Sequence, residues 1–224
     1  MRRVDYGESD LVLGLFTEDL GRLSALARGA RKSRRRFGGV LEPMHTLSVS
    51  VDERIGAELC TLREAKLDTV RTRLTADLER MEIAGRALGW VRRASPPRTP
   101  EPEVWTALSD LLDRLDDPNA APAPRRDLAE AGLRLLVAFG WGLELSRCVS
   151  CGKLCPDGNA AMVDVARGGL VCRSCGGARL RLSGPTRTRL IRAAAGEIGA
   201  LEQGDVDPAL DLSDRAFRAH LGFD

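Results

Sequence analysis

Two cysteine pairs constrain the fold more than any other feature of this 224-residue chain. The segments CVSCG (148–152) and CRSCG (172–176) repeat the pattern C-x-x-C-G, with twenty residues between the two pairs. Each pair brings two thiolates within reach of one cation, and the glycine that follows permits the tight turn in which backbone amides face sulfur. Four thiolates at this spacing match the tetrahedral coordination of a structural Zn²⁺ ion.

The predicted metal ligands are the four cysteines of these pairs: Cys148, Cys151, Cys172 and Cys175. Turn-forming tripeptides, PDG and RGG, flank a short apolar run between the pairs, which predicts a zinc-ribbon hairpin over residues 147–180. Two alternatives stay open: an iron–sulfur cluster, and Cys155 as a ligand in place of Cys151. Because four protein thiolates leave no position for water, the expected role of the ion is structural.

The first quarter of the chain has the apolar alternation of β-strands. Apolar residues alternate along 11–16 and 23–28, and a short loop that contains Gly21 joins these runs as a hairpin. Residues 41–51 and 56–67 continue the pattern without an intervening helix. Short strands at this spacing predict a small barrel or sandwich over residues 1–68.

From residue 69 the spacing of the apolar residues changes to that of helices. Asp127 can cap one of these helices, and Ser183 or Thr186 can open another. The fold class is therefore α+β multidomain, with a helical domain over 69–224 into which the zinc module is inserted. The expected helices cover residues 69–94, 104–117, 127–145, 183–198 and 214–222.

A basic segment interrupts the strands. Between Arg22 and Arg36 the chain holds seven bases and no acid, although its formal net charge is only +2, so the positive field is local. Such a run can be a solvated face, a tail or a targeting signal. Because strands are predicted on both sides, and because the run contains an aromatic residue and ends in Gly38–Gly39, we favour a loop that binds nucleic acid. The candidate residues are Arg22, Arg28, Arg31, Lys32, Arg34, Arg35, Arg36 and Phe37.

The sequence carries no recognisable catalytic motif. Phosphate-binding glycine loops and the G-x-S-x-G elbow are absent, and the two histidines, His45 and His220, lie in no known pattern. We therefore expect a protein that is not an enzyme. No apolar run approaches the ~18 residues of a membrane span, and the charged N-terminus lacks the apolar core of a secretory signal. A cytoplasmic protein is expected.

The residues around the basic segment resemble a known family. The stretch RRVDYGESDLVLGLFTEDLGRLSALARGARKSRRRFGGVLEP (2–43) is similar to the N-terminal domain of the bacterial recombination mediator RecO. The order of a strand-rich front, a helical middle and a late four-cysteine module extends the resemblance over nearly the whole chain. The resemblance implies an OB-fold barrel, followed by an α-helical domain that holds a zinc site.

The resemblance also implies a function in DNA repair through the RecF pathway. That function comprises binding single- and double-stranded DNA, annealing complementary strands and helping to load RecA onto strands coated by single-strand-binding protein. The implied partners are RecR and the acidic C-terminal tail of single-strand-binding protein, and the implied location is the nucleoid. The basic residues match the DNA-facing barrel of the family, the four cysteines match its zinc ligands, and no catalytic residue is implied.

One departure from the family concerns the start of the chain. Family members have an apolar run before RRVDYGESD, whereas here Met1 directly precedes Arg2. Either translation starts further upstream, or the barrel lacks its first strand. Two other function classes also stay open: a zinc-ribbon adaptor that binds only protein, and a zinc-dependent nuclease, which the closed cysteine set disfavours.

Overall fold

The structure is a computed structural model that describes residues 2–33, 36–53, 59–120 and 123–222. The chain divides into two compact units, Met1–Ala120 and Ala121–Asp224, and each is described by itself. The domain boundary predicted near residue 69 falls at the end of the last strand of the first unit. Two of the predicted helices therefore belong to the same unit as the strands.

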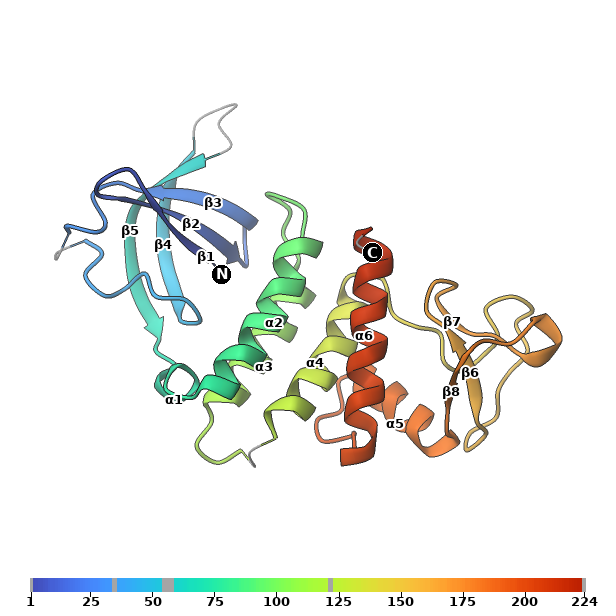
Figure 1. The fold of residues 1–224 in the computed structure, drawn as a ribbon. Helices are drawn as coiled ribbons and strands as arrows, with labels where there is room; N and C mark the ends of the chain where they lie inside the picture. Colours follow the sequence, from blue (N-terminus) through green and yellow to red (C-terminus); the bar gives the residue numbers. More distant parts are fainter. Residues whose placement is uncertain (1, 34–35, 54–58, 121–122, 223–224) are drawn as a thin grey trace. The chain divides into compact units, whose positions relative to one another are not determined.

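A five-stranded sheet opens the first unit (Figure 1). The strands pair in the order β1-β2-β3-β5-β4, with β3 and β5 parallel and all other neighbours antiparallel. This five-stranded arrangement is similar to an OB-fold, which is a partly open barrel. The strands are β1 (Arg2–Tyr6), β2 (Asp10–Thr17), β3 (Gly21–Ala27), β4 (Thr46–Asp52) and β5 (Leu59–Thr69).

The barrel is not closed, because within the described residues no ladder joins β1 to β4. β4 therefore forms an edge, and the register shifts at Thr46/Leu47 and Ser50/Val51 mark irregularities of the kind that protect an edge from further pairing. The expectations from the sequence also need a correction at the start of the chain. Residues Arg2–Tyr6 form a strand paired with β2, which the weak apolar alternation of RRVDY does not reveal.

The predicted alternation places the core of the sheet correctly. Leu11 and Leu13 of β2, and Leu23 and Ala25 of β3, point to the buried face, where none is more than 4% exposed. Their neighbours in sequence are half-buried, so β2 is covered mainly on one face. One core cluster joins these residues to β5 and to the segment after β3.

Three helices complete the first unit: α1 (Thr72–Thr75), α2 (Leu78–Ala94) and α3 (Pro102–Asp116). Arg71 links them to the sheet. Its side chain is buried, and its guanidinium donates to Asp113 in α3, to the Met44 carbonyl and to the Thr46 hydroxyl. Gly21 allows the start of β3 to lie against the loop between α2 and α3, since a Cβ there would stand 1.8 Å from the Thr99 carbonyl oxygen.

The second unit packs three helices beside a small three-stranded sheet of order β7-β6-β8. Helix α4 begins at Pro124, whose fixed φ suits the first turn of a helix. Asp127 therefore lies inside the helix and does not cap it, contrary to the prediction. Ser183 caps α5 as predicted, accepting from the Thr186 amide at 3.1 Å. The elements are α4 (Pro124–Ala138), β6 (Ala161–Asp164), β7 (Gly169–Leu170), β8 (Leu180–Leu182), α5 (Gly184–Ala194) and α6 (Val206–Leu221).

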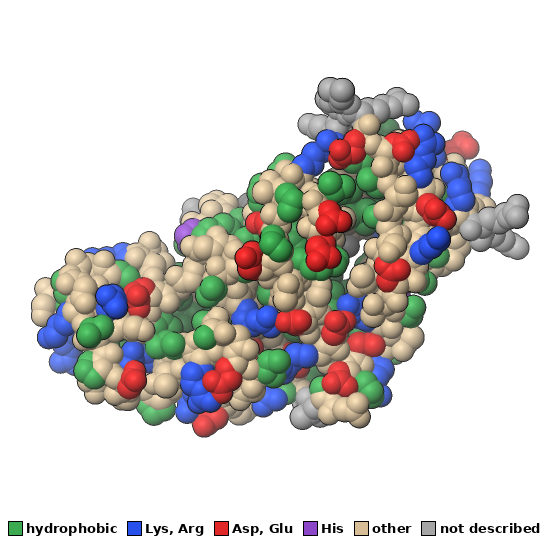
Figure 2. Space-filling view, turned by 180° about the vertical axis from the view of Figure 1, so that it is seen from behind, with side chains coloured by type: hydrophobic (Ala, Val, Ile, Leu, Met, Phe, Trp, Pro, Cys, Tyr) green, Lys and Arg blue, Asp and Glu red, His purple; other side chains and the backbone are tan. Residues whose placement is uncertain are grey.

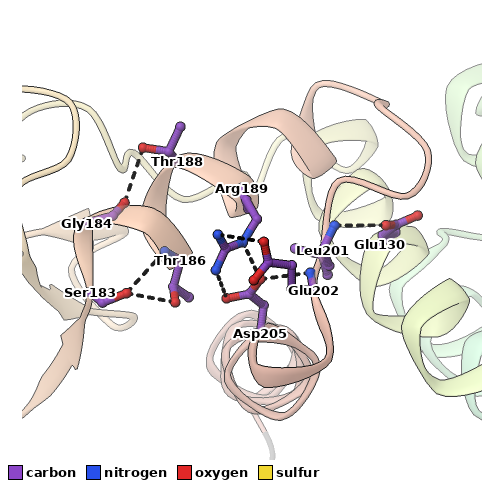
Figure 3. Close-up of polar contacts among 9 residues, drawn as sticks. All are labelled: Glu130, Ser183, Gly184, Thr186, Thr188, Arg189, Leu201, Glu202 and Asp205. Atoms are coloured by element: carbon purple, nitrogen blue, oxygen red, sulfur yellow. Dashed lines mark hydrogen bonds and ion pairs between the residues drawn. The ribbon is translucent and has the colours of Figure 1, made fainter.

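An ion pair between α5 and the segment before α6 stabilises this unit (Figure 3). Arg189 donates two hydrogen bonds to the Asp205 carboxylate, at 2.5 and 3.1 Å, and Asp205 also accepts from the Glu202 amide at 2.9 Å. Glu130 of α4 accepts from the amides of Gly199 and Leu201 in the same segment. Charged hydrogen bonds therefore tie α4, α5 and the start of α6 to one another.

The Asp205 ion pair predicts a pH-dependent stability. Burial raises the pKa of the Asp205 carboxyl, but hydrogen bonds from Arg189 and from the Glu202 amide outweigh burial and leave the pKa below its usual value of 3.8. The stabilisation is therefore complete above pH ~4 and is lost as the pH falls through the lowered pKa of the folded state. We expect Asp205→Asn to lower the free energy of unfolding at pH 7 by about 1–3 kcal/mol.

Urea unfolding at several pH values measures this effect. The difference between wild type and variant should shrink below pH ~4, where Asp205 of the unfolded chain binds a proton, and should vanish once the pH has fallen below the lowered pKa of the folded state. Asp211→Asn, which removes an exposed ion pair with Arg215, is the matched control and should change stability by no more than about 0.5 kcal/mol. A difference that stays constant down to pH 2 would contradict the prediction.

Among the described helices, none combines the length and the apolar character that crossing a lipid bilayer requires.

Candidate metal centre and nucleic-acid interface

The structure brings the four predicted cysteine ligands together. The sulfur atoms of Cys148, Cys151, Cys172 and Cys175 all lie within 4.8 Å of one another. The Cys151 and Cys172 sulfurs are 3.7 Å apart, close to the ~3.8 Å edge of a tetrahedron with metal–sulfur bonds of about 2.3 Å. Cys155 is not part of the cluster. These four cysteines can therefore hold one metal ion.

Both cysteine pairs form the tight turns that the following glycines predict. Gly152 and Gly176 adopt the positive φ angles of 70° and 99°. The Gly152 amide donates to the Cys148 carbonyl at 2.8 Å, and the Cys172 amide points to the Cys148 sulfur at 3.4 Å. Because amide N–H groups stabilise a thiolate, the backbone prepares this sulfur to be a ligand.

The sulfur atoms also perturb one another electrostatically. Backbone hydrogen bonds from Cys172 and Ser150 lower the pKa of Cys148 to about 5. By contrast, hydrogen bonds from the thiols of Cys172 and Cys151 raise the pKa of Cys175 to about 12. Four thiols this close cannot all ionise unless a cation compensates their charge, which is the property of a metal site.

Two arginines that the sequence analysis did not single out support the cluster. Arg167 donates to the Ser150 hydroxyl in the first turn and to the Cys175 carbonyl in the second, so it bridges the two cysteine pairs. Arg187 of α5 is fully buried and donates to the carbonyls of Leu145, Pro156 and Asn159. These three carbonyls bracket the first cysteine pair. The sequence does contain a signal for the burial of Arg187: it lies three residues before Leu190, on the apolar face of α5.

The basic segment is the loop that follows β3, and the sheet holds it at several points. The Arg31 amide donates to the Ser9 carbonyl at 3.0 Å, and the Gly29 amide donates to the Asp10 carboxylate at 2.7 Å. The side chains of Arg28, Arg31, Lys32 and Arg36 are exposed. In Figure 2, Lys and Arg side chains gather over the strand-rich part, with acidic side chains among them. The loop is therefore anchored and presents cations to solvent.

Phe37 has a different place from the one predicted. The sequence suggests an exposed ring that contacts nucleic acid, but the ring is only 3% exposed and packs in the core of the sheet. The Arg36 guanidinium covers it, 5.2 Å from the ring centroid. A ring buried in this way cannot stack on a ligand, so Phe37 anchors the loop to the core.

The remaining seven candidates separate into three groups. Arg22 lies at the start of β3, at the opposite end of the strand from the loop, where its Nε donates to the Ser95 carbonyl at 2.9 Å. Arg34 and Arg35 lie outside the described residues. The described cations that share the loop are thus Arg28, Arg31, Lys32 and Arg36.

The chain has an OB-like sheet with an anchored basic loop, several helices and a four-cysteine cluster. Two family models of DNA recombination proteins match it, so it falls in that class. The model "Recombination protein O N terminal" covers residues 1–70, and "Recombination protein O C terminal" covers residues 75–224. The chain belongs to the RecO family of DNA repair proteins.

Individual relatives agree with the family models. A DNA repair protein RecO of Geobacter sulfurreducens is 38% identical over 224 aligned residues, covering 97% of this chain and 88% of that relative. One from Anaeromyxobacter sp. (strain K) is 38% identical over 201 residues, covering 90% and 74%. One from Myxococcus xanthus is 38% identical over 176 residues, covering 77% and 68%. The similarity therefore spans both units.

Proposed function

We propose that this RecO family member is a DNA-binding recombination mediator without catalytic activity, which binds single- and double-stranded DNA through the loop after β3. The anchored loop with four exposed described cations is the observation that supports this proposal most directly. Phosphate contacts supply most of the affinity of such surfaces, and they contribute equally for any DNA sequence. This suits a protein that must act wherever a strand is damaged.

The further steps of the proposed function follow from family membership. They are the annealing of complementary strands and, together with RecR, the loading of RecA onto strands covered by single-strand-binding protein, whose acidic tail is a proposed partner. The place of action is the nucleoid in the cytoplasm. A protein-only adaptor is the alternative, in which the same cations recognise an acidic peptide.

We further propose that the four-cysteine cluster holds a structural Zn²⁺ ion. The donor set fits this ion because four thiolates with tetrahedral spacing are typical of structural zinc. The ion would cross-link the two cysteine turns, whose backbone amides and bridging Arg167 already hold the sulfurs close together. Its contribution would be to folding and not to chemistry.

Replacing Arg28 and Lys32 together with alanine tests the role of the loop. Neither side chain has an ion-pair partner among the residues that the structure describes, so the change leaves no acid unpaired. We expect weaker binding to a single strand and a plot of log affinity against log salt that is flatter by ~1.4, since each lost phosphate contact contributes ~0.7. Fluorescence anisotropy with a labelled oligonucleotide at several salt concentrations measures both.

A charge-matched control is the double variant Arg73→Ala and Arg218→Ala, whose exposed side chains lie outside the loop and, like those of Arg28 and Lys32, have no ion-pair partner among the described residues. This control lowers the net charge by the same amount as the loop variant, but it should leave the salt dependence of the affinity for the oligonucleotide unchanged. If wild type binds an acidic peptide and shows no salt-dependent affinity for DNA, the adaptor hypothesis replaces the proposed function. If both double variants behave alike, the loop is not the binding surface.

A further inference from the structure

Tyr6 is the only tyrosine of the chain, and the structure leaves it largely uncovered. It is the last residue of β1 and is 57% exposed. A scattered exposed aromatic residue is normal on a protein surface, so exposure alone carries no conclusion. What distinguishes Tyr6 is its position on the sheet relative to the basic loop.

The register of the sheet puts Tyr6 and Arg28 in one row. Tyr6 pairs with Asp10 of β2, and Leu11 pairs with Ala27 of β3, so Arg28 follows at the position across from Asp10. Neighbouring paired residues share a face of the sheet. Leu11 is buried, so Tyr6, Asp10 and Arg28 belong to the outer face. The half-exposed Val4 lies on that face as well, two residues before Tyr6.

Backbone and side-chain contacts fix the basic loop beside this ring. The turn between β1 and β2 accepts the Arg31 amide at Ser9, and Asp10 accepts the Gly29 amide. The Arg31 guanidinium lies 3.6 Å from the carboxylate of Asp5, which pairs with Leu11 and therefore faces the other side of the strand from Tyr6, so this ion pair fixes the loop to β1 without facing the ring. The ring therefore stands on a strand whose distance from the cations of the loop is set by the fold.

An exposed aromatic ring next to phosphate-binding cations is the arrangement that binds single-stranded nucleic acid, because every base has a face that can stack. A duplex cannot use it, since its bases already stack on one another. We infer that Tyr6 is a stacking platform for a base of single-stranded DNA whose phosphates contact Arg28 and its neighbours in the loop. This inference rests on the proposed function and assigns Tyr6 the aromatic role that the buried Phe37 cannot perform.

Two oligonucleotides of equal length and charge test the inference: oligo-dT, and an abasic strand that has phosphates but no bases. Tyr6→Ala should weaken binding to oligo-dT by roughly 5- to 150-fold, the range that one lost base stack gives. Binding to the abasic strand and the salt dependence should be unchanged. Tyr6→Phe keeps the ring and should retain wild-type affinity, and Val4→Ala controls for the loss of neighbouring apolar surface.

A second measurement does not depend on how the variant folds. Photocrosslinking of wild-type protein to an iodouracil-containing strand, followed by mass spectrometry, should place the crosslink at Tyr6. Equal losses on both strands, full affinity of Tyr6→Ala for oligo-dT, or crosslinks only elsewhere would overturn the inference. These outcomes differ from failure of the proposed function, in which the wild-type protein binds neither strand.

Discussion

Replacing Cys172 with serine is expected to release the metal ion and to unfold the module that contains the four-cysteine cluster. The core of this module is small: its buried apolar residues between 147 and 180 are Cys148, Ala161, Val163, Leu170 and Val171. So few apolar residues cannot stabilise a fold alone. The proposed Zn²⁺ ion would supply the difference, since zinc binding to small modules contributes about 10–16 kcal/mol of apparent free energy.

Elemental analysis of the purified protein measures the outcome. Wild type should contain zinc in a one-to-one ratio, and Cys172→Ser should contain little. Cys155→Ser is the matched control, because Cys155 lies in the same module but outside the cluster, and it should keep full metal content. Full zinc in Cys172→Ser would refute the assignment, and visible absorption with bound iron would favour the iron–sulfur alternative.

Removing the buried Arg187 guanidinium should cause the second large loss of stability. Arg187→Met keeps most of the volume but removes the guanidinium that donates to the carbonyls of Leu145, Pro156 and Asn159. The Leu145 carbonyl is in a buried contact and loses this donor, whereas the Pro156 carbonyl still accepts from the Asn159 amide and both of those residues are exposed. A buried carbonyl without its partner costs about 1–3 kcal/mol, so we expect a loss of that size and a fall of roughly 4–12 °C in the midpoint of thermal unfolding.

Arg181→Met is the control for this prediction, since Arg181 is an exposed arginine on β8 of the same unit. It should change stability by no more than about 0.5 kcal/mol. Arg187→Met should also release zinc faster to a chelator, because the three carbonyls position the loop that carries Cys148 and Cys151. A variant with wild-type stability and wild-type zinc release would show that the three hydrogen bonds are dispensable.

Much of this organisation could be predicted from the sequence, because local patterns determine it. The period of two in β2 and β3 identified the buried leucines, and the repeated C-x-x-C-G units identified a cluster that the fold does assemble. The turns at PDG and RGG also form, with Gly158 and Gly168 at positive φ. In each case the residues that decide the structure are close together in the sequence.

The features that could not be predicted depend on contacts between distant segments. Helix α4 ends at Ala138, although the apolar run that predicts it continues to Leu145. The helix ends early because Gly140 turns the backbone at φ 74° and the Trp141 amide donates to the Leu136 carbonyl. Phe37 is buried in a core that three strands build. Arg187 is buried against carbonyls that lie 28 to 42 residues away in the sequence. The spacing of apolar residues within one segment cannot predict contacts with segments so far away.

The anchoring of the basic loop has a consequence for how the protein behaves without DNA. The folded sheet confines Arg28, Arg31, Lys32 and Arg36 to one short loop, and their mutual repulsion opposes folding when little salt is present. If the loop binds DNA as proposed, a bound strand removes this repulsion and stabilises the folded sheet by mass action, to the extent that the strand prefers the folded form. Strand binding and folding of the sheet would then be thermodynamically linked, and the unliganded protein would be least stable in the dilute buffers that favour binding most.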